Sequence, residues 1–353
     1  MSTRCEVEAC DIYPRLHLMR HMGMIKDMHR VQCQEDRNSE NCKVPAGSVF
    51  MTKDILCCPN CRSDLRVMDK PLCLVCANCE ESFELRNGVW LMFRGADLSD
   101  VSFMEYKSYY ERCAKHDLYI LPIDVSQWAC LSSLSKFIRR CQNDLILDIG
   151  SADGKLGELI TGEVVCLDIS ETYLKAAQMK GLTAFAGRAE ALPFKKVFDI
   201  VVLSNILEHV PDPVRVIEEI KKVLKPSGRL YIVVPYEEDI SVYQRGSYPD
   251  PHMSSFDLSS TCLLLKDFEI VRQKFIIFTA FRPYRALVAK LKSWLPDLYT
   301  HLHDVKNHAR DQGGGGKFPK WRHLLNHLPN SFVLPFFKPY SIMIEARYKK
   351  ISE

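Results

Sequence analysis

The stretch LILDIGSADGKLGELI, residues Leu145–Ile160, decides the fold of this 353-residue chain. It begins with an apolar run that is typical of a strand buried on both faces, and Asp148 closes that strand. Three glycines follow at the spacing G-x-x-x-G-x-x-G, and glycine is needed where the backbone turns sharply or lies directly against a ligand. The helix expected next offers free N–H groups and the positive end of its dipole. This arrangement is typical of sites for a dinucleotide or for S-adenosylmethionine, and the alternative is an ordinary corner of an α/β domain.

The segments after this stretch alternate between strand and helix patterns, which predicts a doubly wound parallel sheet. Asp168 ends the second strand, close to the ~20 residues after the first glycine that are expected of a carboxylate holding ribose hydroxyls. The predicted elements are strands at 163–168, 183–186, 198–203, 229–235, 268–278 and 341–348, and helices at 170–180 and 213–224.

Five of these segments together resemble class I S-adenosylmethionine-dependent methyltransferases, and among them the enzymes of quinone biosynthesis. The segments are LDIGSADG, VVCLDIS, GRAEALPF, FDIVVLSNILEHV and EIKKVLKPSGRLYIVVP, and the resemblance covers about residues 144–235. It implies an α/β fold with a doubly wound, seven-stranded Rossmann-like sheet over residues 144–353, with an insertion at about 281–333. In this fold the last two strands pair antiparallel.

The resemblance also implies a cofactor site for S-adenosylmethionine. Asp168 would accept hydrogen bonds from both ribose hydroxyls, Ile169 would pack on adenine, and Asn205 would lie near the sulfonium. The full set of implied cofactor residues is Asp148, Gly150, Ser151, Gly154, Asp168, Ile169, Ala189, Glu190, Asn205 and Leu207.

Two residues depart from the family pattern. Ala152 replaces the middle glycine of the usual G-x-G-x-G, and we expect its methyl group to be tolerated if its φ is not positive. On that basis, Ala152→Gly should leave cofactor affinity nearly unaltered. Arg188 stands where the family often has an acid that contacts the adenine amine, and a guanidinium cannot accept that hydrogen bond. A backbone carbonyl or Glu190 is expected to substitute.

Two histidines are candidates for the catalytic base. Methyl transfer to a hydroxyl or an acidic carbon requires that a proton leave the acceptor. His209 follows the fourth strand of the predicted sheet, at the carboxyl edge where α/β sheets bind ligands, and His252 lies in an H-x-x-x-F segment. The alternative for both histidines is a structural or solvent contact. We expect Glu208 to cap a helix or face solvent.

Residues 54–93 predict a zinc ribbon. Cys58 and Cys61 form one C-x-x-C pair, and Cys76 and Cys79 form a second pair fourteen residues later. Two such pairs place four thiolates around one tetrahedral Zn²⁺, and an all-cysteine site is structural rather than catalytic. Cys73 leaves an alternative pair open, because it also forms C-x-x-C with Cys76. The segment resembles the Trm112-like zinc ribbons, which commonly precede methyltransferase domains.

The remaining segments are less specific. Residues 1–50 are expected to be a disordered leader, and Met51 is an alternative start of translation. Residues 94–143 are expected to be a helical connector, either packed on the sheet or acting as a lid over the cofactor with Tyr106, Tyr109 or Tyr110 facing the site. The stretch 284–295 is amphipathic, so a substrate lid, a peripheral membrane contact or an oligomer contact stays open there.

Composition limits the location and the partners. Residues 281–353 carry 13 Lys and Arg against 5 Asp and Glu, which suits an anionic partner or a merely solvated basic surface. Six of the fifteen cysteines lie between 57 and 79 without an export signal, which favours a reducing cytoplasm and a metal site. The sequence contains no uncharged apolar run of about 18 residues, so we expect no transmembrane helix.

Four functions remain open on the sequence. The first is a methyltransferase for a small-molecule or glycan-like metabolite, and the second is a ribosomal or transfer RNA methyltransferase. The RNA alternative rests on the ribbon, on the basic end of the chain and on a resemblance to a ribosomal RNA guanine methyltransferase. The others are a non-catalytic methyltransferase-like scaffold and a dinucleotide oxidoreductase, which the later motifs disfavour.

Overall fold

The computed structural model describes residues 54–119, 125–141, 143–160, 162–236, 252–281 and 337–349. The expectations for residues 1–50, for the amphipathic stretch 284–295 and for nearly all of the insertion lie outside these ranges. All of these described residues belong to one compact unit. No helix within the described residues has the length and apolar character needed to cross a membrane.

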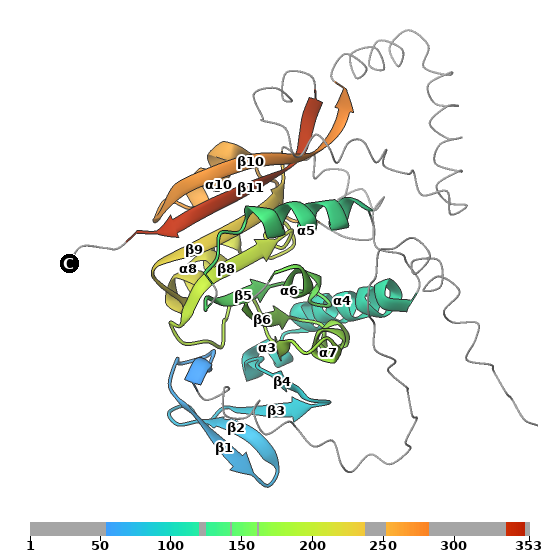
Figure 1. The fold of residues 1–353 in the computed structure, drawn as a ribbon. Helices are drawn as coiled ribbons and strands as arrows, with labels where there is room; N and C mark the ends of the chain where they lie inside the picture. Colours follow the sequence, from blue (N-terminus) through green and yellow to red (C-terminus); the bar gives the residue numbers. More distant parts are fainter. Residues whose placement is uncertain are drawn as a thin grey trace, which may run out of the picture. The chain divides into compact units, whose positions relative to one another are not determined.

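Five parallel strands form the centre of the sheet, in the order β7-β6-β5-β8-β9 (Figure 1). This order reverses direction at β5, which leads into the glycine turn. In such sheets the reversal point is where ligands bind, at the carboxyl ends of the strands. The strands are β5 (Leu145–Ile149), β6 (Glu163–Asp168), β7 (Thr183–Ala186), β8 (Phe198–Ser204) and β9 (Leu224–Pro235).

Two antiparallel strands extend the sheet beyond β9. They are β10 (Phe268–Phe281) and β11 (Phe337–Tyr348), and β11 lies between β9 and β10 with Ile344 opposite Ile232. The antiparallel pairing expected of the last two strands is therefore confirmed.

The sheet has eleven strands in the described part of the chain, so the prediction of seven was wrong. The seven expected strands are all present, and four strands of the ribbon region continue the same sheet. β4 joins it by pairing parallel with β7, with Trp90 opposite Phe185, and β3, β2 and β1 follow antiparallel. The added strands are β1 (Leu65–Asp69), β2 (Leu72–Cys76), β3 (Ser82–Arg86) and β4 (Val89–Leu91). Residues 89–91 are all buried, and this burial stabilises the join.

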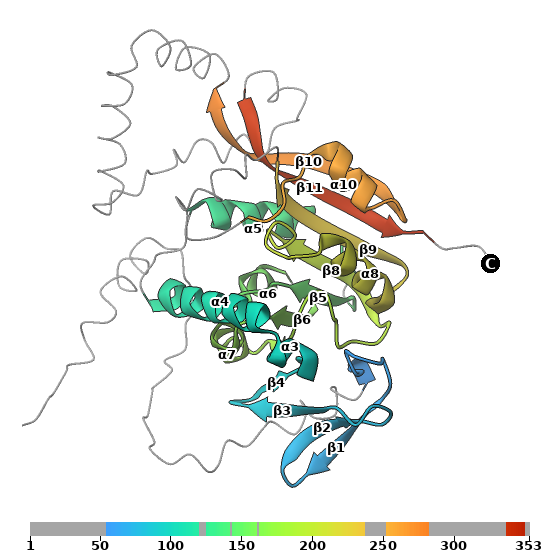
Figure 2. The ribbon, with the colours of Figure 1, turned by 180° about the vertical axis from the view of Figure 1, so that it is seen from behind.

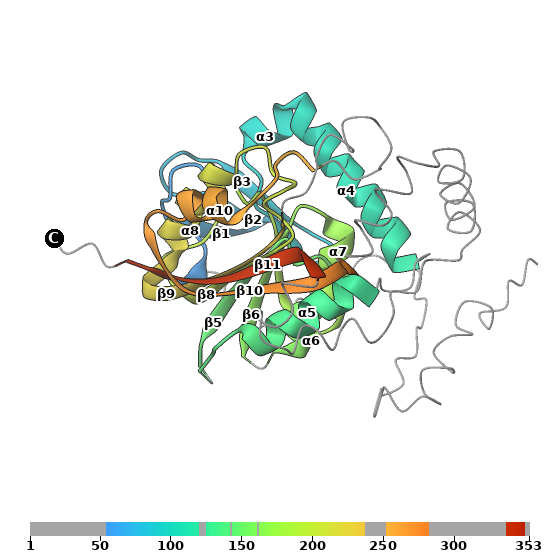
Figure 3. The same ribbon diagram turned by 90° about the horizontal axis from the view of Figure 1, so that it is seen from above.

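Helices cover both faces of the sheet. α8 and α10 lie on the face seen in Figure 2, whereas Figure 3 shows α5 and α6 on the opposite side of the strands from α8 and α10. The side chains of β8 alternate accordingly, since Val201 packs with residues of α8 while Ile200 and Val202 pack with residues of α5. The helices near the sheet are α5 (Val125–Phe137), α6 (Lys155–Leu159), α7 (Glu171–Met179), α8 (Pro213–Val223) and α10 (Leu258–Leu264).

The connector between the ribbon and β5 is helical, as expected. It contains α3 (Gly95–Ser99) and α4 (Val101–Tyr119) before α5. α4 is bound to the start of α7, because the Lys107 ammonium lies 3.0 Å from a Glu171 carboxylate oxygen and the Thr172 N–H donates to Glu111 at 3.2 Å. The inner face of α4 therefore lies beside the end of β6.

Candidate active site

The glycine turn after β5 fits closely against the loop that follows β8. Gly150 has φ +70°, and a Cβ placed on it would lie 2.3 Å from the Ile206 side chain. Its N–H and that of Ser151 donate to the Leu167 carbonyl of β6, at 2.8 and 3.1 Å. The close contact and the positive φ both require glycine at position 150, so the turn brings β5, β6 and the β8 loop together.

Ala152 also has a positive φ, of +46°. The condition set for easy tolerance of its methyl group, a φ that is not positive, is therefore not met. The left-handed conformation costs an L-residue other than glycine about 1–2 kcal/mol, because its Cβ approaches the following carbonyl. The Ala152 N–H donates to the Asp168 carboxylate at 2.9 Å, and this hydrogen bond holds the strained turn in place.

Asp168 lies at the end of β6 with its carboxylate directed into the turn. One oxygen accepts the Ala152 N–H, and the other accepts the Ser170 N–H at 2.9 Å. Burial raises the pKa of Asp168 to about 6, although the backbone hydrogen bonds oppose the rise. Asp148 is 3% exposed, and burial together with the charge of Asp168 raises its pKa to about 8. Two coupled carboxyl groups thus lie under the turn.

Arg188 faces the connector rather than an adenine site. Its guanidinium lies 2.9 Å from Asp97 on α3 and 4.5 Å from the centre of the Phe103 ring on α4. Arg94 pairs with the same aspartate at 2.7 Å. Burial would raise the pKa of Asp97, but the hydrogen bond from Arg94 and the charges of both arginines hold it below its usual value. This network could not be predicted, because nothing in the spacing of the residues connects position 97 to position 188.

Three of the predicted cofactor residues are largely enclosed by the core. Leu207 is fully buried and Ala189 is 8% exposed, both within the cluster that includes α8. Ile169 is half-buried against the cluster on the opposite face. The Glu190 carboxylate lies 3.5 Å from Arg188.

Asn205 follows β8 in a left-handed conformation, with φ +54°. Its N–H donates to the Val233 carbonyl at 2.9 Å, and its side-chain amide lies 3.9 Å from the Cys130 sulfur on α5. Burial raises the pKa of Cys130 to about 11, so this residue stays a neutral thiol. Asparagine tolerates the left-handed region better than most residues, which suits it to this sharp exit from the strand.

His209 and His252 lie together, although they are far apart in the sequence. Their ring centres are 4.6 Å apart and the rings are nearly perpendicular. The Tyr106 hydroxyl of α4 donates to the His209 carbonyl at 3.1 Å, and the Tyr110 ring lies 6.1 Å from the His209 ring. Glu208 is 1% exposed, so the expectation that it would face solvent was wrong.

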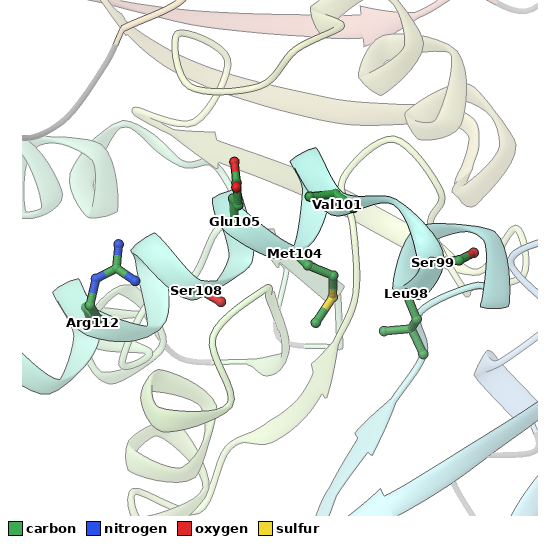
Figure 4. Close-up of a pocket in the computed structure, with 7 residues that line it drawn as sticks. All are labelled: Leu98, Ser99, Val101, Met104, Glu105, Ser108 and Arg112. Carbon is green, nitrogen blue, oxygen red and sulfur yellow. The ribbon is translucent and has the colours of Figure 1, made fainter.

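A surface hollow of about 550 Å³ lies along α3 and the first half of α4 (Figure 4). Its α4 residues recur every three or four positions on the outward face of that helix, whereas Phe103 and Tyr106 point inward. None of the predicted site residues lines it, so we do not assign the chemistry to this hollow. The lining residues are Leu98, Ser99, Val101, Met104, Glu105, Ser108 and Arg112.

The ribbon region brings four sulfurs together. The Cys58 and Cys79 sulfurs are 3.6 Å apart, those of Cys61 and Cys76 are 3.3 Å apart, and those of Cys61 and Cys79 are 3.6 Å apart. These four residues are close enough for their sulfur atoms to hold one metal ion. Cys73 is not in the cluster, since it lies within β2 opposite Met68 and Glu84.

The first cysteine pair is attached to the segment that precedes β8. The Cys57 N–H donates to the Pro193 carbonyl at 2.9 Å, and the Lys195 N–H donates to the Ile55 carbonyl at 2.8 Å. The Arg62 guanidinium donates to the Leu192 carbonyl at 2.7 Å and also to the Phe194 carbonyl. The ribbon thus holds the segment that begins two residues after Glu190.

Part of the chain is similar in sequence to known methyltransferases. Residues 147–232 match the family model described as a methyltransferase domain. A demethylmenaquinone methyltransferase of Lactococcus lactis is 33% identical over 112 residues, which cover 29% of this chain and 44% of that protein. A ubiquinone biosynthesis O-methyltransferase of Hydrogenovibrio crunogenus is 31% identical over 110 residues, which cover 27% of this chain and 46% of that protein.

A solved structure, phosphoethanolamine N-methyltransferase 2 of Haemonchus contortus in complex with S-adenosyl-L-methionine, aligns at 16% identity with a TM-score of 0.43. The alignment covers 72% of this chain and 60% of the Haemonchus contortus protein. The chain spans less than half the length of the two curated relatives. These matches support a methyltransferase domain over residues 147–232.

Proposed function

We propose that the protein is an S-adenosylmethionine-dependent methyltransferase that acts on a small-molecule or glycan-like acceptor in the cytoplasm. One observation carries the proposal. The glycine turn, with Asp168 beneath it, lies directly against the β8 loop that contains Asn205 and leads to His209. A cofactor-binding turn and a candidate proton-handling group thus share one edge of the sheet.

The glycine turn and Asp168 form the cofactor side of this site. When bound, S-adenosylmethionine supplies the methyl group. Asp148, Gly150, Ser151 and Gly154 would line its methionine and ribose parts, and the Asp168 carboxylate would accept the ribose hydroxyls. Ionised carboxylates accept stronger hydrogen bonds than neutral groups do, which suits this role.

The adenine and sulfonium ends would be held by residues farther along the chain. Ile169 and Ala189 offer apolar contacts for adenine, and Glu190 can accept from its amine. Arg188 is already bound to Asp97, so it leaves that contact to Glu190 or to backbone carbonyls. Asn205 and Leu207 would lie at the sulfonium end.

The acceptor side is formed by the β8 loop and by α4. The protein's main contribution to methyl transfer is alignment, because holding two reactants in line removes most of the entropic cost of their encounter. A hydroxyl or acidic carbon must also lose its proton. His209 and His252 are the candidates for this step, and their adjacency favours the proposal.

The acceptor class is proposed from the relatives. One curated relative is named a demethylmenaquinone methyltransferase and the other a ubiquinone biosynthesis O-methyltransferase, and these names favour a quinone-related small molecule as the acceptor. RNA is the second candidate, favoured by the ribbon beside the methyltransferase domain. Binding to RNA would weaken steeply with salt, because each neutralised phosphate releases counterions.

We also propose that the four clustered cysteines hold one structural Zn²⁺. At the usual Zn–S distance of about 2.3 Å, tetrahedral sulfurs lie about 3.8 Å apart. The observed separations of 3.3 to 3.6 Å need only a slight opening to reach that value. Four thiolates leave no open position, so the zinc would stabilise the ribbon rather than take part in methyl transfer.

The test is mass spectrometry of small-molecule extracts and of RNA from cells with and without the gene. The proposal expects one metabolite to lose a CH₂ group in mass when the gene is deleted, and expression of the gene should restore it. A methylation lost only from RNA would support the second candidate and contradict the first. If no methylated species changes, both are contradicted.

A further inference from the structure

Three side chains next to the proposed acceptor site have the types and spacing of metal ligands. Donor atoms of Glu208, His209 and His252 all lie within 4.8 Å of one another. Glu208 and His209 are buried and His252 is half-buried. The His209 Nε2 atom lies 4.0 Å from a Glu208 carboxylate oxygen.

The backbone fixes these three residues in place. The Glu208 carbonyl accepts hydrogen bonds from the Met253 N–H at 2.7 Å and from the Ser254 N–H at 3.2 Å. These two bonds join the β8 loop to the segment that carries His252. On the other side, the Tyr106 hydroxyl holds the His209 carbonyl. The site is thus built from three separate parts of the chain rather than from one flexible loop.

The donor types suit a divalent transition metal ion. Two imidazoles and one carboxylate bind zinc, manganese or iron, and three protein ligands leave positions open for substrate oxygens. Ligand atoms 2.0–2.2 Å from a shared ion lie about 3 to 4 Å apart, so small side-chain movements would close the observed separations. A cation would also offset the cost of a buried carboxylate charge.

We propose that Glu208, His209 and His252 bind one divalent cation, which in turn binds two neighbouring oxygens of the acceptor. On this proposal the two histidines act on the acceptor proton through the cation rather than as a general base. The inference rests on the proposed methyltransferase function and narrows its acceptor to a molecule with adjacent hydroxyl or carbonyl oxygens, such as a catechol.

Methyl transfer from S-adenosylmethionine to such an acceptor needs no reactant besides these two molecules and water. The cation binds the acceptor hydroxyl and favours loss of its proton to water, as a Lewis acid does. The acceptor oxygen keeps the electron pair of the broken O–H bond and uses it to form a bond to the methyl carbon. The carbon–sulfur bond breaks at the same time, and its electron pair stays on sulfur.

The position of the site supports this role. Glu208 is close enough to Cys130 for its charge to contribute to the raised pKa of that thiol, and Cys130 contacts Asn205 at 3.9 Å. Asn205 and Ile206 come from the same loop, and Ile206 lies against the glycine turn at Gly150. An acceptor bound by the cation would therefore lie next to the proposed cofactor turn.

The test is a titration with Mn²⁺ of full-length protein that carries one zinc ion per chain, as shown by metal analysis, followed by electron paramagnetic resonance. Mn²⁺ prefers oxygen and nitrogen ligands and competes poorly with zinc for thiolates, so the cysteine cluster stays occupied. We expect one bound Mn²⁺ per chain, with affinity about 100-fold weaker in His252→Ala. The matched control is Met253→Ala, which changes the exposed neighbouring side chain and should bind Mn²⁺ as the unaltered protein does.

A second variant and a second ligand make the test independent of folding and of catalysis. Glu208→Gln keeps the shape of a buried side chain, and its folding is checked by its melting curve; it should also lose Mn²⁺ binding. Adding catechol should change the Mn²⁺ spectrum of the unaltered protein but not that of His252→Ala.

Absence of Mn²⁺ binding, or equal binding in His252→Ala and Met253→Ala, would overturn the metal site. Calorimetry with S-adenosylmethionine on His252→Ala separates this result from failure of the proposed function, since cofactor binding should persist.

Discussion

The two sides of the carboxyl edge are built in different ways. The proposed cofactor side is made mostly of backbone, with Gly150 and Ala152 in left-handed conformations and their N–H groups bonded to β6 and Asp168. The proposed acceptor side is made of side chains, in which His209 and His252 lie together beside Tyr106. The first side lies within a short stretch of consecutive residues, whereas the second joins segments that are far apart in the chain.

This difference corresponds to what each side has to recognise. A turn shaped by glycine and by backbone hydrogen bonds keeps its form whichever side chains flank it, so it suits a cofactor shared by many enzymes. Side chains carry the selectivity for an acceptor, because they can differ from one protein to the next without disturbing the fold. Substitutions in the turn and in the carboxylates beneath it test the proposed cofactor side, and the largest effect is expected at Asp168.

The largest effect is expected from Asp168→Asn. Asparagine removes the charge of the group that would accept the ribose hydroxyls, so these hydrogen bonds weaken. The variant should bind S-adenosylmethionine about 100-fold more weakly, a loss of about 3 kcal/mol in binding free energy. Isothermal calorimetry measures the change. Glu163→Gln alters an exposed acid at the opposite end of the same strand and serves as the control. Equal affinity in the two variants would remove the ribose role of Asp168.

Gly150→Ala should destabilise the fold by about 2–3 kcal/mol, because the new Cβ meets the Ile206 side chain in addition to the positive φ. Gly181→Ala is the matched control, since Gly181 has φ +82° and no atom lies within 4 Å of the position that a Cβ would take there. This control substitution should cost about 1 kcal/mol. Urea unfolding gives both values. If the two substitutions cost the same, the contact between the turn and the β8 loop contributes nothing.

The pH dependence of stability should report the buried carboxyl pair. The pKa of Asp148 is raised to about 8 in the fold, so the stability it contributes when protonated is complete below pH ~4 and is lost as the pH rises to about 8. Urea midpoints measured from about pH 5 to about pH 8 should fall in the cofactor-free protein, and Asp148→Asn should reduce that slope. A slope that is the same in both proteins would exclude Asp148 as its source.

Zinc removal tests the connection between the ribbon and the cofactor side. The Arg62 guanidinium and the Cys57 N–H hold residues 192–194, so a loosened ribbon should weaken S-adenosylmethionine binding about threefold to tenfold, or roughly 1 kcal/mol. Metal analysis before and after chelation should show one zinc lost per chain. Unchanged cofactor affinity after proven loss of zinc would mean that the two regions are independent.

The smallest effect is expected from Ala152→Gly. Since Ala152 has φ +46°, glycine should stabilise the fold by up to about 1 kcal/mol, net of its greater freedom in the unfolded chain. Denaturant unfolding measures this change. A loss of stability would show that the alanine methyl group contributes packing worth more than the strain it causes.

The sequence predicted the strands and the turn of the proposed cofactor side well, because their signals are local. Strand periodicity and the glycine spacing located the β5 turn, and β6 and β7 have the predicted bounds. The conformation of Ala152 could not be predicted, since φ depends on how Asp168 and Leu167 bond to the turn.

The acceptor side and the ribbon junction were predicted less well because they depend on tertiary contacts. Glu208 was expected to cap a helix or face solvent, but it is buried where residues 253 and 254 bond to its carbonyl, a contact that depends on the tertiary fold. The pairing of β4 with β7 adds four strands to the sheet, yet nothing in the period of residues 89–91 indicates which strand they join. The four cysteines are the exception, since their spacing alone predicted which sulfur atoms lie together in the structure.

The most direct test of the account is a calorimetric titration of the purified protein with S-adenosylmethionine, in which the affinity and the number of sites are measured. The account predicts a single site, filled at cofactor concentrations below about 1 mM and weakened by Asp168→Asn but not by Glu163→Gln. No binding at about 1 mM cofactor by protein that is folded and zinc-loaded would contradict it.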